Sequence, residues 1–273
     1  PTTSIIAKLE TGRPGKTVAL RADIDALPLH ENPENLAGPR TCCSEDPATC
    51  HGCGHDAHSA MLLGAMKVLT EMKDELCGTV LFCYEEGEEP NSGIQALLAA
   101  LEKYNVDYCW GIHVYAELEE GKISVDAGPR MAGASAVDVV FRGKSGHASR
   151  PDLAANPIFA GASYLNNLCV AFCNQITAGQ TVTMAVPMIH GGEAANVIGE
   201  TCSVMGTFRF FDLEEGKKAR DIAVNVAEHT AKMFKCEAEV ADRMRNFIGG
   251  PVVNDAGRSA SATKVLNGIL PEG

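Results

Sequence analysis

Short apolar runs alternate with helix-like segments between residues 16 and 113 of this sequence. The runs at residues 16–24, 78–84 and 107–113 are rich in aliphatic and aromatic side chains, and they predict strands. Residues 58–72 carry apolar side chains at helical spacing, and residues 94–101 belong to a second predicted helix. This order predicts a mostly parallel sheet covered by helices, with functional groups at the carboxyl ends of the strands.

The order of elements changes after residue 129. Strands are predicted at residues 134–141, 181–189, 201–211 and 236–241, with helices at residues 155–172 and 214–233. This βαββαβ order is typical of ferredoxin-like domains. Residues 247–253 then predict a return crossing, and residues 259–266 a helix of the first domain. We therefore expect an α/β fold with a mostly parallel-sheet domain in residues 1–128, an inserted ferredoxin-like α+β domain in residues 129–245, and a return to the first domain in residues 246–273.

Composition narrows the class of protein. The chain has 273 residues, 45% of them hydrophobic, which is enough for one large or two modest domains. A net charge of −12 argues against nucleic acid and anionic membranes as partners. We find no apolar run of transmembrane length, and the first residues do not lead us to expect a signal peptide. The 11 cysteines, an odd number, are scattered through apolar segments, so we expect reduced cysteines and a cytoplasmic protein.

The run CHGCGHDAH at residues 50–58 concentrates metal-binding residue types. Cys53, His55 and His58 offer the thiolate and imidazole donors that suit zinc and its first-row neighbours. Two further groups of donors directly follow predicted strands: the carboxylates Glu85, Glu86, Glu88 and Glu89, and then His113. This pattern favours a catalytic metal site with open coordination positions.

Simpler interpretations stay open at this point. Cys50 and Cys53 match the C-x-x-C redox pattern, although that motif needs a helix directly after it, and further polar residues intervene. The glutamates are also compatible with an ordinary solvated charge run, and His113 with a core histidine. His147 on a loop and Arg209 in a strand are compatible with an exposed side chain and a salt bridge at the edge of the core.

Several short motifs occur in series along the chain: LRADIDALP at residues 20–28, CGHD at 53–56, EE at 88–89, WGIH at 110–113, GKSGH at 143–147, GGEAANV at 191–197 and GTFR at 206–209. Together they resemble the amidohydrolase branch of the aminoacylase/glutamate-carboxypeptidase metallopeptidase family, which includes hippurate hydrolase and plant auxin-conjugate hydrolases. The resemblance extends over about residues 18–255. It implies a metallopeptidase domain of α/β type with an inserted lid and dimerisation domain.

The resemblance also implies roles for individual residues. It implies a metal centre with the ligands Cys53, His55, Glu89 and His113. These would hold one or two divalent ions (Zn²⁺, Mn²⁺, Ni²⁺ or Co²⁺), and the Cys53 thiolate would be able to bridge two of them. Glu88 would be the general base, and Asp25 would orient a ligand. The substrate's carbonyl and carboxylate would be held by His147, Asn196 and Arg209.

The expected activity is metal-dependent hydrolysis of the amide bond in N-acyl amino acids or similar small conjugates. The resemblance further implies a homodimer through residues 129–245, with His147 serving the partner's active site. Family members have a longer N-terminal segment and a further C-terminal segment with a last metal-binding histidine, so we expect this chain to be truncated at both ends. Alone, it is expected to bind at most one ion tightly and to hydrolyse poorly. The alternative is a catalytically impaired binding or scaffold fragment that lacks the last metal ligand.

Overall fold

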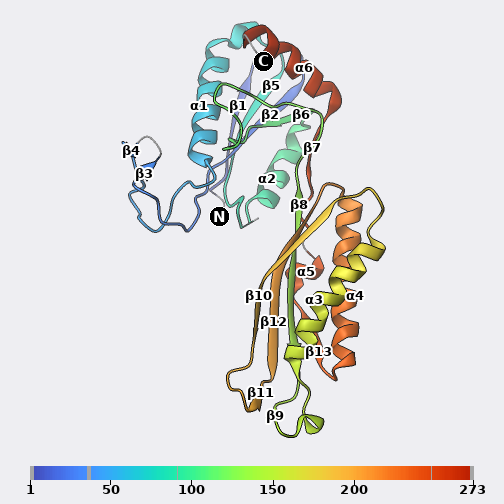
Figure 1. Ribbon diagram of the computed structural model, residues 1–273. Coiled ribbons are helices and arrows are strands. Elements are labelled where there is room, and N and C mark those ends of the chain that lie inside the picture. Colours follow the sequence, from blue (N-terminus) through green and yellow to red (C-terminus); the bar gives the residue numbers. More distant parts are fainter. Residues whose placement is uncertain (1–2, 36–37, 91, 247, 271–273) are drawn as a thin grey trace. The chain divides into compact units, whose positions relative to one another are not determined.

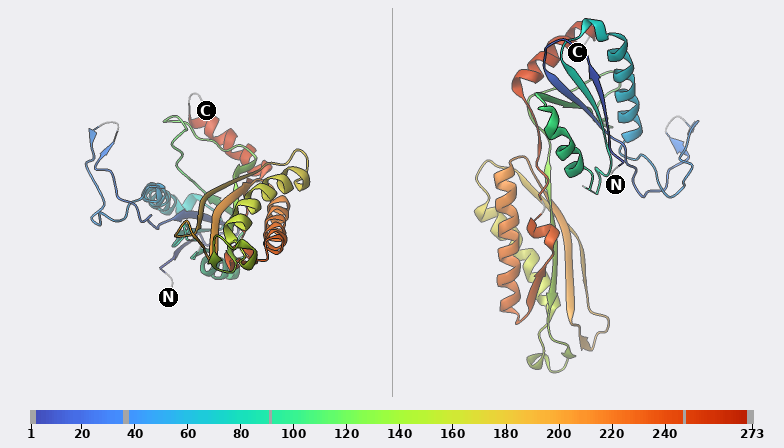
Figure 2. Two further views of the ribbon diagram at one scale, coloured as in Figure 1. Left: turned by 60° about the horizontal axis from the view of Figure 1, so that its bottom comes forward. Right: turned by 180° about the vertical axis from the view of Figure 1, so that it is seen from behind.

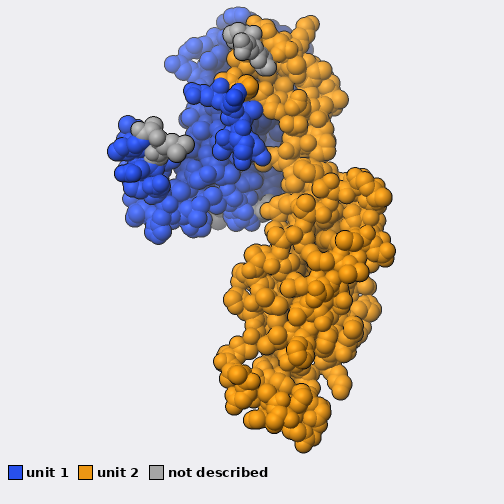
Figure 3. Space-filling model, in the orientation of Figure 1, with its two compact units in different colours: residues 1–120 blue, residues 121–273 orange. Residues whose placement is uncertain are grey.

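The computed structural model describes residues 3–35, 38–90, 92–246 and 248–270. The chain forms two compact units, Pro1–Glu120 and Gly121–Gly273, which Figure 3 distinguishes by colour. The expected division into residues 1–128, 129–245 and 246–273 stays a prediction.

The first unit contains a four-stranded sheet with the order β1-β5-β2-β6. Its strands are β1 (Ile5–Glu10), β2 (Thr17–Asp23), β5 (Thr79–Glu85) and β6 (Tyr108–Gly111). The strands β5, β2 and β6 run parallel, and β1 pairs antiparallel with β5 at the edge. The predicted, mostly parallel sheet is therefore confirmed, whereas β1 was not predicted.

Two helices cover opposite faces of this sheet (Figure 1). Helix α1 (His55–Glu71) packs Leu62 with Phe82 and Tyr84 of β5, and helix α2 (Ile94–Leu101) packs Leu97 against the other face. The sheet interior is apolar on both faces, as parallel sheets require. The unit also contains the short elements β3 (Glu34–Asn35), β4 (Gly38–Pro39), η1 (Lys73–Glu75) and η2 (Glu102–Tyr104).

The second unit is built around an antiparallel sheet with the order β10-β12-β8-β13. Its elements follow the predicted βαββαβ order: β8 (Gly133–Arg142), α3 (Pro157–Gln175), β10 (Val182–Gly191), β12 (Thr201–Phe210), α4 (Leu213–Met233) and β13 (Glu237–Val240). Strand β8 alternates buried and half-buried side chains along its length. Helices α3 and α4 cover one face of the sheet, as Figures 1 and 2 show. The ferredoxin-like topology is therefore confirmed.

Short elements lie at both ends of this sheet. At one end, β9 (Gly146–His147) pairs with β11 (Val197–Ile198); at the other, β7 (Gly128–Met131) pairs with β14 (Val252–Asn254). The remaining elements are η3 (Pro151–Leu153), α5 (Asp242–Asn246) and α6 (Ala256–Ile269). The helix expected at residues 259–266 is confirmed as the longer α6, while Phe247 of the expected crossing lies outside the described residues.

In the part of the chain that the structure describes, no helix is both long enough and apolar enough to span a membrane.

Candidate metal centre

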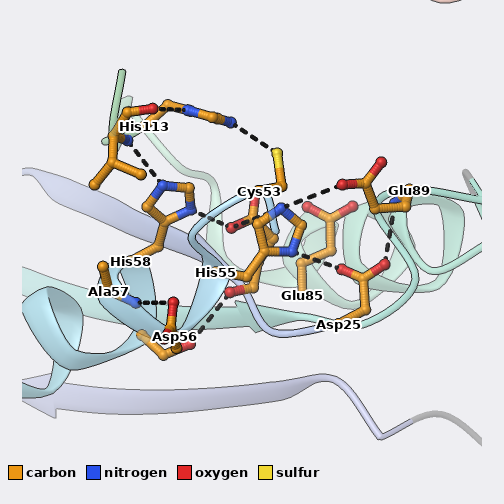
Figure 4. Close-up of polar contacts among 12 residues, drawn as sticks. Asp25, Cys53, His55, Asp56, Ala57, His58, Glu85, Glu89 and His113 are labelled. Atoms are coloured by element: carbon orange, nitrogen blue, oxygen red, sulfur yellow. Dashed lines mark hydrogen bonds and ion pairs between the residues drawn. The ribbon is translucent and has the colours of Figure 1, made fainter. Parts of the chain in front are cut away.

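Polar side chains gather where the parallel strands of the first unit end. Asp25 follows β2, Glu89 follows β5 and His113 follows β6. The carboxyl ends of parallel strands meet at one edge of a sheet, so these side chains come from distant parts of the sequence to one place. Cys53 and His55 reach the same place from the start of α1 (Figure 4).

A glycine makes the turn into α1 possible. Gly54 precedes the helix with a φ of 82°, a left-handed conformation that glycine adopts without strain. A Cβ atom at this position would lie 2.3 Å from Val114 Cγ2. Because Gly54 has no side chain, the segment after β6 packs directly on the turn, between Cys53 and His55.

The structure brings the predicted ligands together. Cys53 Sγ, a ring nitrogen of His55 and a carboxylate oxygen of Glu89 all lie within 4.8 Å of one another. His55 Nε2 is 3.8 Å from Glu89 Oε1, and Cys53 Sγ is 3.4 Å from His113 Nε2. Figure 4 shows these side chains pointing toward one another.

Hydrogen bonds place the lone pair on Nε2 in two of the imidazoles. His55 Nδ1 lies 3.1 Å from Asp25 Oδ1, and His113 Nδ1 lies 2.5 Å from the carbonyl oxygen of Val114. Both oxygens only accept, so Nδ1 is the protonated nitrogen in each ring and Nε2 carries the lone pair. His55 Nε2 is buried and has no hydrogen-bond partner. A buried polar atom without a partner costs free energy unless something binds it, so the residues present fit a metal ion.

Asp25 connects two of the predicted ligands. Its Oδ1 accepts from His55, and its Oδ2 accepts from the backbone N–H of Glu89 at 3.1 Å. A carboxylate behind a metal-binding histidine orients the ring and raises its basicity. This geometry fits the orienting role that the sequence resemblance implies for Asp25.

The glutamates after β5 lie in different environments. Glu85 is 1% exposed and pairs with Arg21, whose Nε lies 2.7 Å from Glu85 Oε2. Burial and then the charge of Glu89 raise the pKa of the half-buried Glu88 carboxyl. Burial and then a hydrogen bond with Glu89 raise the pKa of the Cys53 thiol to about 11. A bound cation would stabilise the thiolate and relieve the repulsion between the carboxylates.

His58 belongs to this region but has no free lone pair. Its Nδ1 lies 2.6 Å from Asp23 Oδ1, and its Nε2 accepts from the backbone N–H of Val114 at 2.9 Å. Asp23, His55 and His58 also lie close together, but both nitrogens of His58 are already in use. Sequence reasoning treated His58 only as one more donor, and it gave Asp23 no role. The available signal was that Asp23 and Asp25 lie at the end of a predicted strand, where open α/β sheets place their functional groups.

The predicted substrate-binding residues all lie in the second unit, and all three are exposed. His147 and Asn196 are neighbours, since Val197 pairs with His147 and the Ala148 N–H donates to the Asn196 carbonyl oxygen at 3.0 Å. Arg209 lies on β12 opposite Ala134, at the other end of the sheet. The structure thus brings two of the three together and places the third elsewhere.

A thiolate, imidazoles and carboxylates gathered at a sheet edge are the donor set of a hydrolytic metal centre, so the fold and site define a metallohydrolase. The family model described as "Peptidase family M20/M25/M40" matches residues 19–263. The chain belongs to this family, and it is a hydrolase of the metal-dependent amidohydrolase and peptidase type. The resemblance seen in the sequence is confirmed.

Three curated relatives illustrate the range of the family. The chain is 31% identical to thermostable carboxypeptidase 1 of Saccharolobus solfataricus, over 98% of this chain and 67% of the relative. It is 32% identical to the N-acetylcysteine deacetylase of Bacillus subtilis, over 87% of this chain and 61% of the relative. It is also 33% identical to IAA-amino acid hydrolase ILR1-like 4 of Arabidopsis thaliana, over 93% and 56%. The chain thus spans about half to two thirds of the length of these relatives.

A solved structure supports the same assignment. The Bacillus subtilis YXEP protein, described as a dinuclear metal binding peptidase from the M20 family, superposes with a TM-score of 0.75 at 27% sequence identity. The match covers 97% of this chain and 66% of that protein.

Proposed function

We propose that the protein hydrolyses the amide bond of N-acyl amino acids or related small conjugates. The observation that carries the proposal is the buried, unpartnered His55 Nε2, which faces Glu89 and lies beside Cys53. Relatives named as an N-acetylcysteine deacetylase and an IAA-amino acid hydrolase support an N-acyl amino acid as the substrate class.

Cys53, His55, Glu89 and His113 would hold one or two divalent ions (Zn²⁺, Mn²⁺, Ni²⁺ or Co²⁺). When bound, such an ion acts as a Lewis acid and lowers the pKa of water. Asp25 keeps the His55 ring in position through Nδ1. Glu88 removes a proton from the attacking water and passes it to the leaving amine, as a positioned carboxylate does in general acid–base catalysis.

The exposed residues of the second unit bind the substrate. The guanidinium of Arg209 pairs with the substrate carboxylate, an arrangement that allows two parallel hydrogen bonds. His147 and Asn196 hold the carbonyl oxygen, where negative charge develops during the reaction.

The sheet geometry supports a homodimer through residues 129–245. Thr201 pairs with Arg142, just before the segment that leads to His147, so it marks that end of the sheet. Arg209 lies eight residues further along β12. At about 3.4 Å per residue this is roughly 27 Å, longer than a small N-acyl amino acid. We infer from this separation that His147 serves the active site of a partner chain. Strand β10 lies at the edge of the sheet, where backbone groups need covering or pairing.

We further infer a cytoplasmic protein without nucleic acid or membrane partners. All 11 cysteines are free thiols, as expected of a reducing compartment. The net charge of −12 disfavours binding to polyanions. A redox role for Cys50 and Cys53 has less support, because Cys53 Sγ faces His113 and lies within reach of His55 and Glu89. The comparisons give no support to an impaired binding or scaffold fragment.

Hydrolysis of a panel of N-acyl amino acids tests the proposal. We expect turnover that disappears when a chelator removes the metal and returns with Mn²⁺ or Zn²⁺. N-acyl amines that lack the carboxylate serve as matched control substrates and should be hydrolysed poorly. Tight substrate binding without turnover in the metal-loaded protein would instead favour the binding or scaffold function.

A thiol titration separates the redox alternative. Metal should protect Cys53 from a thiol reagent, whereas exposed thiols such as Cys42 and Cys77 should react equally with and without metal. Reversible formation of a Cys50–Cys53 disulfide in the metal-loaded protein would support the redox function.

A further inference from the structure

A buried histidine that is not among the proposed ligands contacts the segment that carries one of them. His58 lies in the first turn of α1 and is 2% exposed. Its Nε2 lies 2.9 Å from the backbone nitrogen of Val114, the residue directly after His113. The rings of His58 and His113 also contact each other, with centroids 4.6 Å apart.

The protonation of His58 follows from its partners. The backbone N–H of Val114 can only donate, so His58 Nε2 must be the accepting nitrogen. A neutral ring then carries its proton on Nδ1, which donates to Asp23 Oδ1 at 2.6 Å. The ring thus connects the carboxylate at the end of β2 with the backbone that follows β6, and both of its nitrogens are engaged.

Asp23, the carboxylate that accepts from His58, is held firmly in place. Asp23 is 2% exposed and also pairs with Arg21, whose Nη1 lies 2.9 Å from Asp23 Oδ2. Arg21 in turn pairs with the buried Glu85. Burial alone would raise the pKa of Asp23, but the hydrogen bond with His58 and the charge of Arg21 outweigh it and lower that pKa. Asp23 is therefore a charged and fixed acceptor for His58.

Val114, the other partner of His58, determines where His113 lies. Val114 packs its side chain over Gly54, in space that a Cβ atom there would fill. Its carbonyl oxygen accepts from His113 Nδ1 and sets the direction of that ring. His113 is itself exposed, so burial does not hold its side chain in place. The hydrogen bond from the Val114 N–H to the buried His58 fixes this segment.

We propose that His58 is a positioning residue for the metal centre: through the backbone N–H of Val114 it holds His113 with Nε2 directed at Cys53 Sγ. The inference rests on the proposed function, because it takes His113 as a ligand. His58 touches neither metal nor substrate in this role, and Asp23 supports it by fixing the tautomer. Partners behind a metal ligand are commonly worth about 10–100-fold in metal affinity.

Two amide substitutions separate the two hydrogen bonds of His58. In His58→Asn, the amide nitrogen lies near the position of Nδ1 and still donates to Asp23, but Val114 N loses its acceptor. In His58→Gln, the amide oxygen lies near the position of Nε2 and still accepts from Val114, but the donor to Asp23 is lost. Ser59→Ala is the matched control, since Ser59 Oγ donates to the Asp23 carbonyl oxygen at 3.2 Å without touching the His113 segment.

The experiment measures Zn²⁺ affinity by chelator competition and the visible absorption spectrum of the Co²⁺-loaded protein. We expect His58→Asn to weaken affinity by about 10–100-fold and to shift the Co²⁺ spectrum toward that of His113→Ala. His58→Gln and Ser59→Ala should stay close to wild type in both measurements. In a His113→Ala background, His58→Asn should cause no further loss, because the two residues act as one unit. Urea unfolding of the metal-free variants confirms that each is folded.

Three results would overturn the inference: wild-type affinity and spectrum in His58→Asn, a larger loss in His58→Gln than in His58→Asn, or additive losses in the double variant. The second result would indicate that His58 serves only to pair the buried Asp23. Unchanged metal binding in His113→Ala would overturn the ligand assignment itself, and with it this part of the proposed function.

Discussion

At the scale of single residues, the centre depends on which nitrogen of each histidine is free. The family resemblance implied Cys53, His55, Glu89 and His113 as ligands, and the structure brings these side chains together. Residue type and spacing did not distinguish His55 from His58, which lie three residues apart; only the family resemblance favoured His55. In the structure, His58 differs from His55 because its Nε2 accepts from Val114, which lies 56 residues away in the chain. Local spacing in the sequence does not reveal such a contact.

Asp25 offers a test at this scale. Asp25→Ala removes the acceptor for His55 Nδ1 and for the Glu89 N–H. Two proposed ligands then lose their orientation, so we expect metal affinity to fall by about 10–100-fold. Chelator competition measures the effect. Asp56→Ala is the matched control: among the residues that the structure describes, the exposed Asp56 accepts only from its neighbour Ala57, so the metal affinity of this variant should not change.

At the scale of elements, periodicity predicted most of the fold. The order of the second unit was correct because its helices and strands are long and regularly patterned. Strand β1 was missed because it lies at a sheet edge and, of its side chains, only that of Leu9 is buried. Helix α1 begins at His55, three residues before the predicted start at residue 58. The prediction missed its first turn because that turn carries polar residues of the site, which do not follow the apolar pattern of the core.

The turn before α1 gives an element-scale prediction. Gly54→Ala forces a side chain into a left-handed conformation and against Val114, so we expect a loss of about 1–3 kcal/mol in the free energy of unfolding. Gly64→Ala, inside the same helix and in open space, should instead gain about 0.5–1 kcal/mol. Urea titrations of the metal-free proteins measure both. Equal effects in the two variants would contradict the packing described at Gly54.

The junction of β2 and β6 gives a prediction on pH. A hydrogen bond from Lys16, and then one from the Thr17 N–H, lower the pKa of Asp107. A carboxyl whose pKa is lowered by folding stabilises the protein above its ordinary pKa of about 3.9, and this stabilisation is lost as the pH falls through the lowered value. At neutral pH, the Asp107→Asn variant should therefore have a lower urea midpoint of unfolding than the wild type. In acid, the two midpoints should become equal. In a Lys16→Gln background the effect at neutral pH should shrink.

At the scale of the whole molecule, the proposed homodimer explains why His147 and Arg209 lie at opposite ends of one sheet. The sequence order suggested the domain but not this separation, which follows from strand register. Mixing inactive Glu88→Gln chains with inactive His147→Ala chains should restore partial hydrolysis, because one hybrid site then holds both native groups. Subunit exchange is verified with tagged chains. Exchange without any recovery would rule out a site shared across subunits.

The central claim is that Glu89 holds the metal while Glu88 moves the proton. Metal content per chain and turnover, measured together on Glu88→Gln and Glu89→Gln, test it most directly. The account predicts that Glu88→Gln keeps its metal, because all proposed ligands remain. Its turnover should fall by about 10²–10⁴-fold, because the residue that carries the proton is lost. Glu89→Gln should lose metal. Loss of metal in Glu88→Gln, or undiminished turnover in that variant, would contradict the account.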